Sequence, residues 1–253
     1  MSEIMLYAED IETNYENFIA VCPECGYKNI FNRVSDLKTI QPISFKEVRC
    51  FNESCGKIFG INRDRIQSRY LTLFFDCYPL YEEKRYSNCV LLLTQALEVF
   101  FYHYLKVELV YRPFWKETKR DVDQVNSLLN SLQSAVEKLA YGKLKNVFLN
   151  WVVNESKISC LADSTSKISA LRKYSDNPPS EEELKKIPNS TLADLLIDLK
   201  GCEVDKLRNK VVHKEAYRPN REEVETAIEE VRELLIKISY HLDVLEEDIN
   251  SYH

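Results

Sequence analysis

The chain has 253 residues, of which 45% are hydrophobic and 29% charged, with only 5 Gly and 8 Pro. This length predicts one or two domains, and the composition excludes a disordered, collagen-like or coiled-coil chain. The formal net charge of −6 argues weakly against nucleic acid as a partner, because contacts with phosphates require Lys and Arg.

The sequence gives no sign of secretion or of a membrane anchor. The first dozen residues carry acidic side chains where a signal peptide requires a basic start and an apolar run. The longest apolar stretch, residues 90–105, is interrupted by Gln95, Glu98 and His103, so we expect no membrane span. We therefore place the chain in a reducing cytoplasm, where closely spaced cysteines indicate metal before disulfides.

The 8 cysteines divide into two groups. Four of them form two pairs, Cys22 with Cys25 and Cys50 with Cys55, with two and four residues inside the pairs and 24 residues between them. Glycine directly follows each pair and accommodates the backbone of a knuckle turn. The other four lie among apolar neighbours and are expected to be buried thiols: Cys77, Cys89, Cys160 and Cys202.

The four paired cysteines resemble the ligands of a zinc ribbon. Thiolates bind Zn²⁺ tetrahedrally, and four sulfur ligands leave no position for water or substrate, so we expect a structural Zn²⁺. Short alternating apolar runs from residue 15 to about residue 60 predict strands around the metal. We place this β zinc ribbon, with its N-terminal lead-in, at residues 1–62. The alternative is four unrelated buried thiols.

The ribbon sequence is basic although the whole chain is acidic. From Cys22 to Tyr70 there are nine basic and five acidic residues, a net charge of +4. Basic charge with interleaved aromatic rings is compatible with nucleic-acid binding. The alternative is a small aromatic core beside a solvated basic face. The aromatic residues concerned are Tyr27, Phe31, Phe51 and Phe59.

Residues 63–253 are expected to form an all-α domain. Residues 85–110 are apolar nearly all round at helical spacing, which predicts the central helix of a bundle that ends before Pro113. His103 on this helix is expected to be a core histidine. An apolar stripe predicts an amphipathic helix at residues 122–140.

Shorter helices and their caps follow along the chain. Helical patterns are found at residues 143–154 and 163–174. Capping boxes are predicted at two places, Ser180 with Glu183 and Asn220 with Glu223, the second opening a long helix. Ser190 is a candidate N-cap of the helix that Gly201 closes.

A short helix predicted at residues 203–212 carries the residues that suggest chemistry. It lies in a second basic segment, residues 200–221, with seven basic and three acidic residues. Arg208 offers fixed donors suited to a phosphate, and His213 can exchange a proton near neutral pH. These two groups suffice for RNA cleavage without a metal, because a base can deprotonate the ribose 2′-hydroxyl while a cation stabilises charge on the phosphoryl oxygens.

The spacing of Arg208 and His213 restricts how they can act together. On a continuous helix a step of five residues rotates by about 140°, so the two side chains would not share one face. Either the helix ends near residue 212, or the two residues act across different subunits. The alternative is that both belong to a solvated helix end.

The string Arg208-Asn209-Lys210-Val211-Val212-His213, followed by a turn with proline and a long Glu-rich helix, resembles the motif of the HEPN superfamily. That motif is an Arg, a polar residue that is often Asn, and then a His. Residues 91–105 are similar to the first core helix of that family. The resemblance covers residues 85–245.

This resemblance implies a mainly α, HEPN-like bundle that dimerises with two copies of the motif facing each other in a cleft. Many members are metal-independent endoribonucleases of toxin–antitoxin, phage-defence and RNA-processing systems. The resemblance assigns His213 as acid or base, Arg208 as phosphate ligand and Asn209 as an orienting group. It gives Glu98 a supporting role, for which the alternative is a polar residue at a helix edge.

We therefore expect a cytoplasmic endoribonuclease that cuts RNA as a homodimer and leaves 2′,3′-cyclic phosphate ends, in antiphage defence or a toxin–antitoxin system. The ribbon would recognise the substrate or a partner such as a regulatory or antitoxin protein. One alternative is a non-catalytic adaptor for nucleic acid or protein, and another is a DNA-binding regulator. Residues 222–248, with ten acidic and two basic side chains, are a solvated face by default, with a dimer surface or an inhibitor docking site as alternatives.

Overall fold

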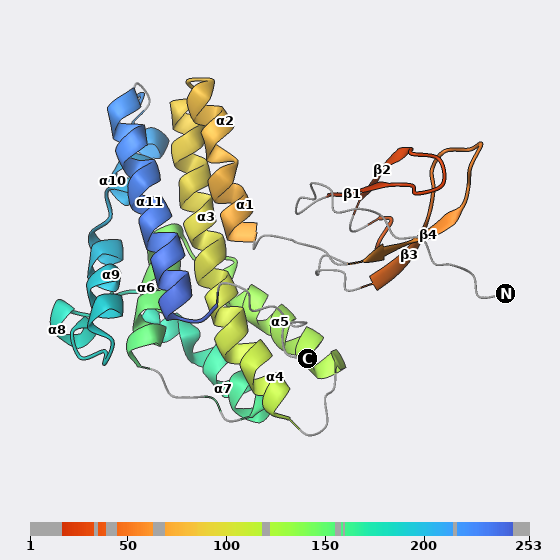
Figure 1. The fold of residues 1–253 in the computed structure, drawn as a ribbon. Helices are drawn as coiled ribbons and strands as arrows, with labels where there is room; N and C mark the ends of the chain where they lie inside the picture. The colour runs from red at the N-terminus through yellow and green to blue at the C-terminus, as the bar shows by residue number, and fades with distance from the viewer. Residues whose placement is uncertain are drawn as a thin grey trace. The chain divides into compact units, whose positions relative to one another are not determined.

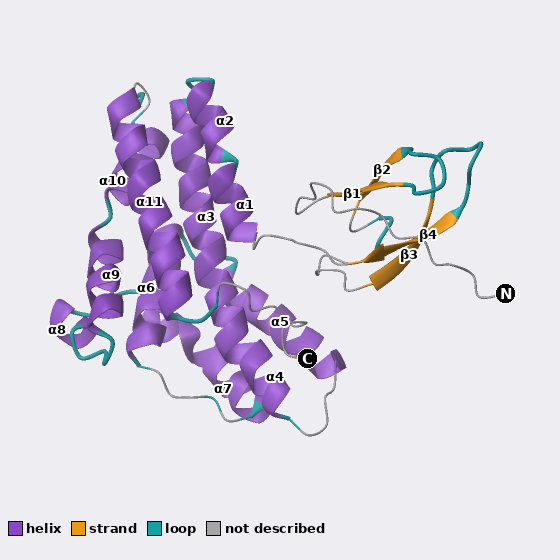
Figure 2. Cartoon of the chain, viewed as in Figure 1, coloured by secondary structure: helices purple, strands orange, loops and turns teal. Residues whose placement is uncertain are grey.

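A computed structural model of the protein describes residues 17–32, 35–38, 45–62, 69–117, 122–154, 158, 160–214 and 217–244. Contacts within the chain divide it into two units, Met1–Thr72 and Leu73–His253, and each unit is described by itself. The boundary that we expected, after residue 62, lies within the first of them. The described part is mainly helical with a small N-terminal β region, as Figure 2 shows, which confirms the mainly α fold class.

The first unit contains two antiparallel β-hairpins (Figure 1), and one cysteine pair lies in the turn between the strands of each hairpin. β1 (Asn17–Val21) pairs with β2 (Lys28–Asn32), and β3 (Phe45–Arg49) pairs with β4 (Ile58–Asn62). Alternate side chains of these strands are buried, as expected where one face of a sheet packs on a core. The small core contains Phe18, Ala20, Phe31, Leu37, Val48, Phe59 and Ile61.

The helical elements follow in one series. They begin with α1 (Arg69–Phe75), which crosses the boundary between the two units. After it come α2 (Cys77–Glu82), α3 (Tyr86–Lys106), a π-helical turn η1 (Val107–Tyr111), α4 (Arg112–Lys116), α5 (Val122–Val136), α6 (Tyr141–Val153), α7 (Leu161–Ala170), the 3-10 turn η2 (Leu171–Tyr174), α8 (Glu181–Leu184), α9 (Ser190–Gly201), α10 (Glu203–His213) and α11 (Arg221–His241).

Helix α3 is the central helix of the second unit, as expected from its apolar composition. It packs against α2, α6, α10 and α11, and Figure 1 shows these helices around it. Its aromatic side chains make the core with Phe148 of α6, whose ring centroid lies 4.8 Å from that of Phe101 and 5.1 Å from that of Tyr104. His103 on α3 is half-buried, with its Nε2 atom 3.3 Å from the carbonyl oxygen of Val244, and burial lowers the pKa of its ring to about 3.

The expectation that this helix ends before Pro113 is wrong. The chain continues from α3 through the π-helical turn η1 into α4, and Pro113 lies in the first turn of α4. Proline has no N–H, and its ring would clash with the carbonyl of residue 109 in a regular α-helix. The wider π turn removes that conflict, so the helical path continues. Beyond it, Arg112 donates to the carbonyl oxygens of Leu242 at 3.1 Å and Asp243 at 2.9 Å, at the end of α11.

The helix caps agree with the sequence at most positions. Both capping boxes are present, Ser180 with Glu183 and Asn220 with Glu223. The N-cap of α9 is Asn189 and not Ser190, because the Asn189 side chain accepts from the N–H of Leu192.

One described helical stretch, Tyr86–Phe114, is long and apolar enough to cross a membrane by length and composition alone. Of its most apolar window, 56% is buried inside the bundle. That burial fits the core helix of a soluble protein.

Candidate functional site

The two hairpins present four cysteines at their turns. Cys22 follows β1 and Cys25 precedes β2, and the second pair stands in the same way between β3 and β4. Glycine follows each pair at positive φ, +70° at Gly26 and +54° at Gly56, a conformation that favours glycine. The N–H of Cys22 donates to the carbonyl of Tyr27 at 2.9 Å and closes the first turn. The sequence therefore shapes both turns as knuckles.

The four sulfur atoms come together in one cluster. All lie within 4.8 Å of one another, and this is the one group of potential metal ligands found among the described residues. Sulfurs from opposite knuckles are closest, with 3.8 Å from Cys22 to Cys55 and 3.7 Å from Cys25 to Cys50. The cluster is a possible metal site, and it lies where the sequence predicts it.

Backbone amides and burial act differently on the thiols. The N–H of Tyr27 hydrogen-bonds to the sulfur of Cys25 and lowers the pKa of this thiol to about 7. Burial raises the pKa of Cys50, and the N–H of Asn52 opposes that rise. Amides directed at sulfur are the typical surroundings of thiolate ligands in a metal centre.

Asn29 is a buried polar residue that connects the two knuckles, and the sequence patterns did not reveal its role. Its amide group donates to the carbonyl oxygens of Tyr27 at 3.0 Å and Ala20 at 3.3 Å, both in the first hairpin. Its side-chain oxygen accepts from the N–H of Phe51 at 2.7 Å, in the second knuckle. The one signal in the sequence is an asparagine at an inward-facing position of a strand.

The aromatic residues of the ribbon divide between the two interpretations that the sequence left open. Phe31 and Phe59 are each 2% exposed and belong to the core. Tyr27 is 45% exposed and Phe51 50% exposed, directly beside the knuckles.

The second candidate site lies on α10, which is continuous to His213. Arg208 and His213 therefore stand five residues apart on one helix, and within one chain they point to different sides. Arg208 is half-buried, and its guanidinium donates to the side-chain oxygen of the neighbouring Asn209 at 3.1 Å. His213 is exposed in the last turn.

Glu98 lies on α3, which packs against α10, and its carboxyl group is close enough to Arg208 to feel the charge of the guanidinium. Burial raises the pKa of this carboxyl group, and the positive charge of Arg208 opposes the rise. The sequence offered Glu98 as a supporting residue, and the structure places it beside the α10 motif.

Buried polar contacts fix the start of α10. Lys145 of α6 is 7% exposed, forms an ion pair with Asp205 in the first turn of α10, and donates to the carbonyl oxygen of Lys200 at 3.2 Å. The carboxylate of Glu230 on α11 accepts from the N–H groups of Glu203 at 3.0 Å and Val204 at 3.3 Å. These contacts cap the N-terminus of α10 and hold it against its neighbours.

Lys210 and Tyr217 take part in the contacts between the C-terminal end of α10 and the start of α11. The Tyr217 hydroxyl donates to the carboxylate of Glu223 at 2.6 Å, and the ammonium group of Lys210 lies 5.3 Å from the centroid of the Tyr217 ring. The basic charge of Lys210 is therefore partly engaged in anchoring α10 to the start of α11.

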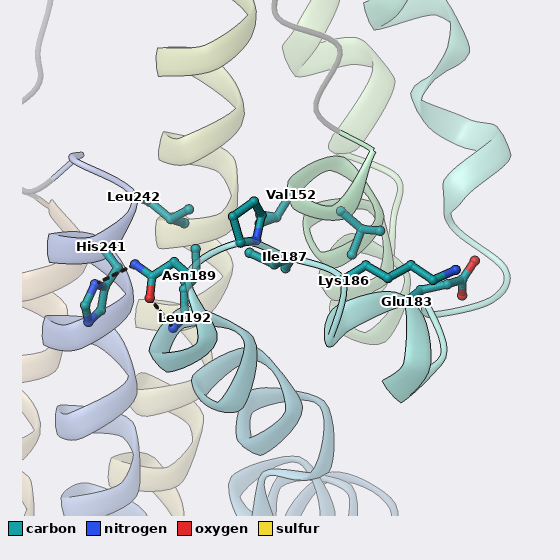
Figure 3. Close-up of a pocket in the computed structure, with 10 residues that line it drawn as sticks. Val152, Glu183, Lys186, Ile187, Asn189, Leu192, His241 and Leu242 are labelled. Atoms are coloured by element: carbon teal, nitrogen blue, oxygen red, sulfur yellow. Dashed lines mark hydrogen bonds between the residues drawn. The ribbon is translucent and has the colours of Figure 1, made fainter.

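A pocket of about 390 Å³ lies elsewhere in the helical unit (Figure 3). The figure shows the ring of His241 beside Asn189, to which it is hydrogen-bonded at 3.2 Å. No residue of α10 lines this pocket, so it does not include the predicted motif. The lining residues are Val152, Val153, Glu183, Lys186, Ile187, Pro188, Asn189, Leu192, His241 and Leu242.

The four cysteines outside the ribbon lie in the helical unit. Cys77, Cys89 and Cys202 are buried, as expected, whereas Cys160 is partly exposed.

The fold and the sites define a class: a mainly helical protein that carries a cysteine-rich β unit with a possible metal site at its N-terminal end. Comparison with known proteins adds no family name, since no family, curated protein or solved structure matches the chain significantly.

Proposed function

We propose that the protein is a cytoplasmic, metal-independent endoribonuclease of the HEPN type, acting as a homodimer in antiphage defence or a toxin–antitoxin system. The observation that carries the proposal is the placement of Arg208, Asn209 and His213 on α10, a helix fixed at its start by buried contacts and accessible at its end. The hydrogen bond from Arg208 to the side-chain oxygen of Asn209 at 3.1 Å supports a guanidinium held in place, and the half-buried Glu98 adds a carboxyl group nearby.

The divergence of Arg208 and His213 on α10 favours a site built from two chains. A second copy related by a two-fold axis can place its own α10 opposite, so that Arg208 of one protomer meets His213 of the other. Leu91 and Val212 are exposed large apolar residues. Leu91 stands seven residues before Glu98 and Val212 four residues after Arg208, spacings that repeat the same helix face. These faces supply apolar surface for such an interface.

The proposed chemistry uses these groups alone. The imidazole of His213 takes the proton of the ribose 2′-hydroxyl, whose oxygen attacks the adjacent phosphorus. The guanidinium of Arg208 stabilises the negative charge that develops on the phosphoryl oxygens. The bond to the 5′-oxygen breaks and this oxygen takes up the proton held by the imidazolium of His213, so that the products are a 2′,3′-cyclic phosphate and a 5′-hydroxyl and the base is restored.

We also propose that the four cysteines hold a structural Zn²⁺. Four sulfurs at about 2.3 Å from a tetrahedral ion lie about 3.8 Å from one another. The separations of 3.8 Å and 3.7 Å between opposite knuckles agree with this geometry. When bound, the ion would cross-link the two hairpins, while the ribbon contributes recognition of the RNA or of a regulatory or antitoxin protein.

Cleavage of mixed RNA in the presence of EDTA tests the proposal. The parent should cut and leave 2′,3′-cyclic phosphate ends, and His213→Ala and Arg208→Ala should each abolish the cut. Lys206→Ala is the matched control, because Lys206 is a basic residue on the same helix whose ammonium group pairs with the exposed Glu203. Equal behaviour of the parent, His213→Ala and Arg208→Ala would contradict the proposal.

Mixing the two inactive variants tests the composite site. If Arg208 and His213 act across the interface, random reassociation makes half of the dimers mixed, each with one intact site of two, so about a quarter of the parental activity returns. If both residues act within one chain, the mixture stays inactive.

A non-catalytic adaptor is the second candidate. It applies if the chain acts as a single copy, since a single copy does not assemble the reacting groups of Arg208 and His213. It predicts RNA or protein binding by parent and variants alike, without cleavage.

A further inference from the structure

Two exposed aromatic rings stand at the knuckles of the ribbon, and the proposed chemistry gives them no role. Tyr27 follows Gly26 in the first knuckle, and Phe51 follows Cys50 in the second. They are 45% and 50% exposed, although rings of this size normally contribute to a core. We call these two residues the knuckle aromatic pair.

The backbone beneath the knuckle aromatic pair is held by one side chain. The amide of Asn29 donates to the carbonyl of Tyr27 at 3.0 Å, and its oxygen accepts from the N–H of Phe51 at 2.7 Å. One carboxamide therefore joins the two backbones, which brings residues 24 positions apart in the sequence into neighbouring places. The backbones of Tyr27 and Phe51 therefore lie next to each other where the two knuckles meet.

A further contact holds the ring of Phe51, and another holds the backbone of Tyr27. Phe51 packs against the buried Phe31, with 4.8 Å between ring centroids, which fixes one side of the Phe51 ring. The N–H of Tyr27 hydrogen-bonds to the sulfur of Cys25, a candidate metal ligand, which holds the backbone from which the Tyr27 ring projects. Binding a ligand to rings already held in place costs little conformational entropy.

The surroundings of the pair carry net positive charge. Lys28, Arg49 and Lys57 are exposed on the strands and turns that adjoin the two rings. Glu24 and Glu53 are the acidic side chains of the knuckle turns, so the basic groups exceed the acidic ones here. The excess at the knuckles is one positive charge, in a sequence segment from Cys22 to Tyr70 that has a net charge of +4 while the whole chain has −6. This excess favours an anionic ligand.

We propose that the knuckle aromatic pair is a stacking platform for single-stranded nucleic acid, with Lys28, Arg49 and Lys57 contacting the backbone phosphates. Exposed rings stack on unpaired bases largely without regard to sequence, and a positively charged surface follows the strand. A duplex does not offer this contact, because its bases are stacked on each other. The inference rests on the proposed function in giving the ribbon the role of substrate recognition, and it assigns that role to particular residues and to unpaired strands.

Binding, measured apart from cleavage, tests this inference. The full chain with His213→Ala, which lacks the proposed base, is titrated into a labelled RNA of about 20 nucleotides without secondary structure, and into the matching duplex. Tyr27→Ala and Phe51→Ala should each weaken binding to the single strand about tenfold, and the double variant about a hundredfold. Replacing Lys28 or Arg49 by Gln should reduce the slope of log K against log salt concentration by about 0.7 for each phosphate that is no longer neutralised.

The controls separate stacking from folding. Tyr27→Phe keeps the ring and should bind as the parent does, whereas Tyr240→Ala removes a ring that is 71% exposed on α11 and should change nothing. Unchanged metal content in every variant shows that the ribbon is intact.

Two results would overturn the inference. In the first, the double variant binds the single strand as tightly as the parent does. In the second, the parent does not bind the single strand at all, and the knuckle aromatic pair is then assigned to a protein partner. Because the assay contains no cleavage step, failure of the proposed nuclease activity leaves the binding result readable, and the reverse also holds.

Discussion

Asp205→Ala should destabilise the helical unit strongly, because it removes the partner of a buried ammonium group. Lys145 is 7% exposed and contacts the Asp205 carboxylate and the carbonyl oxygens of Leu199 at 3.4 Å and Lys200 at 3.2 Å. Breaking one partner out of a buried ion pair costs about 3–5 kcal/mol. Because Lys145 keeps its two carbonyl acceptors, we expect a loss near the lower end, about 3 kcal/mol in the free energy of unfolding.

Urea denaturation followed by tryptophan fluorescence measures this loss in the helical unit alone. Both tryptophans of the chain, Trp115 and Trp151, lie within that unit, so unfolding of the ribbon does not contribute directly to the signal. The double variant Lys145→Met with Asp205→Leu should recover most of the stability, since apolar residues can replace a buried pair at little cost.

A matched exposed pair supplies the control. Lys206 and Glu203 form an ion pair on the same helix, with side chains 64% and 62% exposed, so Lys206→Met should change the free energy of unfolding far less than Asp205→Ala does. If Asp205→Ala costs no more than Lys206→Met, the buried pair does not anchor α10, and the reasoning is refuted.

Three further predictions concern the metal, the pH dependence and the caps. The purified chain should contain one Zn²⁺ by mass spectrometry, and Cys22→Ser should lower the metal content. Exhaustive chelation should unfold the ribbon, because a structural Zn²⁺ contributes on the order of 10 kcal/mol to folding. A metal-free chain with unchanged strand signals in circular dichroism would contradict this. Burial lowers the pKa of His103 to about 3, below its value of about 6.5 in the unfolded chain, so its neutral form stabilises the fold above pH 6.5 and this contribution is lost as the pH falls towards 3. Relative to the parent, His103→Gln should therefore show a shallower loss of stability between about pH 6.5 and 4 in urea titrations, and parallel curves would disprove the assignment. Asn220→Ala removes the side chain that accepts from the N–H of Glu223 and should cost about 1 kcal/mol in the same denaturation experiment, whereas an unchanged midpoint would show that the cap contributes nothing.

The features that the sequence predicted well depend on partners close in the chain. The capping boxes join residues three positions apart, so both could be predicted from the sequence, Ser180 with Glu183 and Asn220 with Glu223. The knuckle cysteines were readable because each pair and its glycine form one short turn. The predicted N-cap of α9 is one position too late, because Asn189 and Ser190 are adjacent and both residue types suit an N-cap.

The features that escaped prediction depend on partners distant in the chain. Asn29 meets Phe51 across 22 residues, Lys145 meets Asp205 across 60, and Glu230 meets Glu203 across 27. None of these pairs leaves a periodic pattern, because each exists only after the elements have packed. Pro113 was misjudged for a related reason, since the π turn that admits it widens the backbone before the proline itself.

The π turn at Val107–Tyr111 also sets the angular phase of everything that follows it on this helix. Such a turn accommodates one residue more than a regular helical path, and each α-helical residue corresponds to about 100° of rotation. If the same residues were wound as a regular α-helix, with none deleted, Arg112 would be rotated by about 100°, away from the carbonyl oxygens of Leu242 and Asp243. The wider winding of the π turn thus sets the rotational position of α4, and the guanidinium reaches the end of the last helix only while that winding is kept.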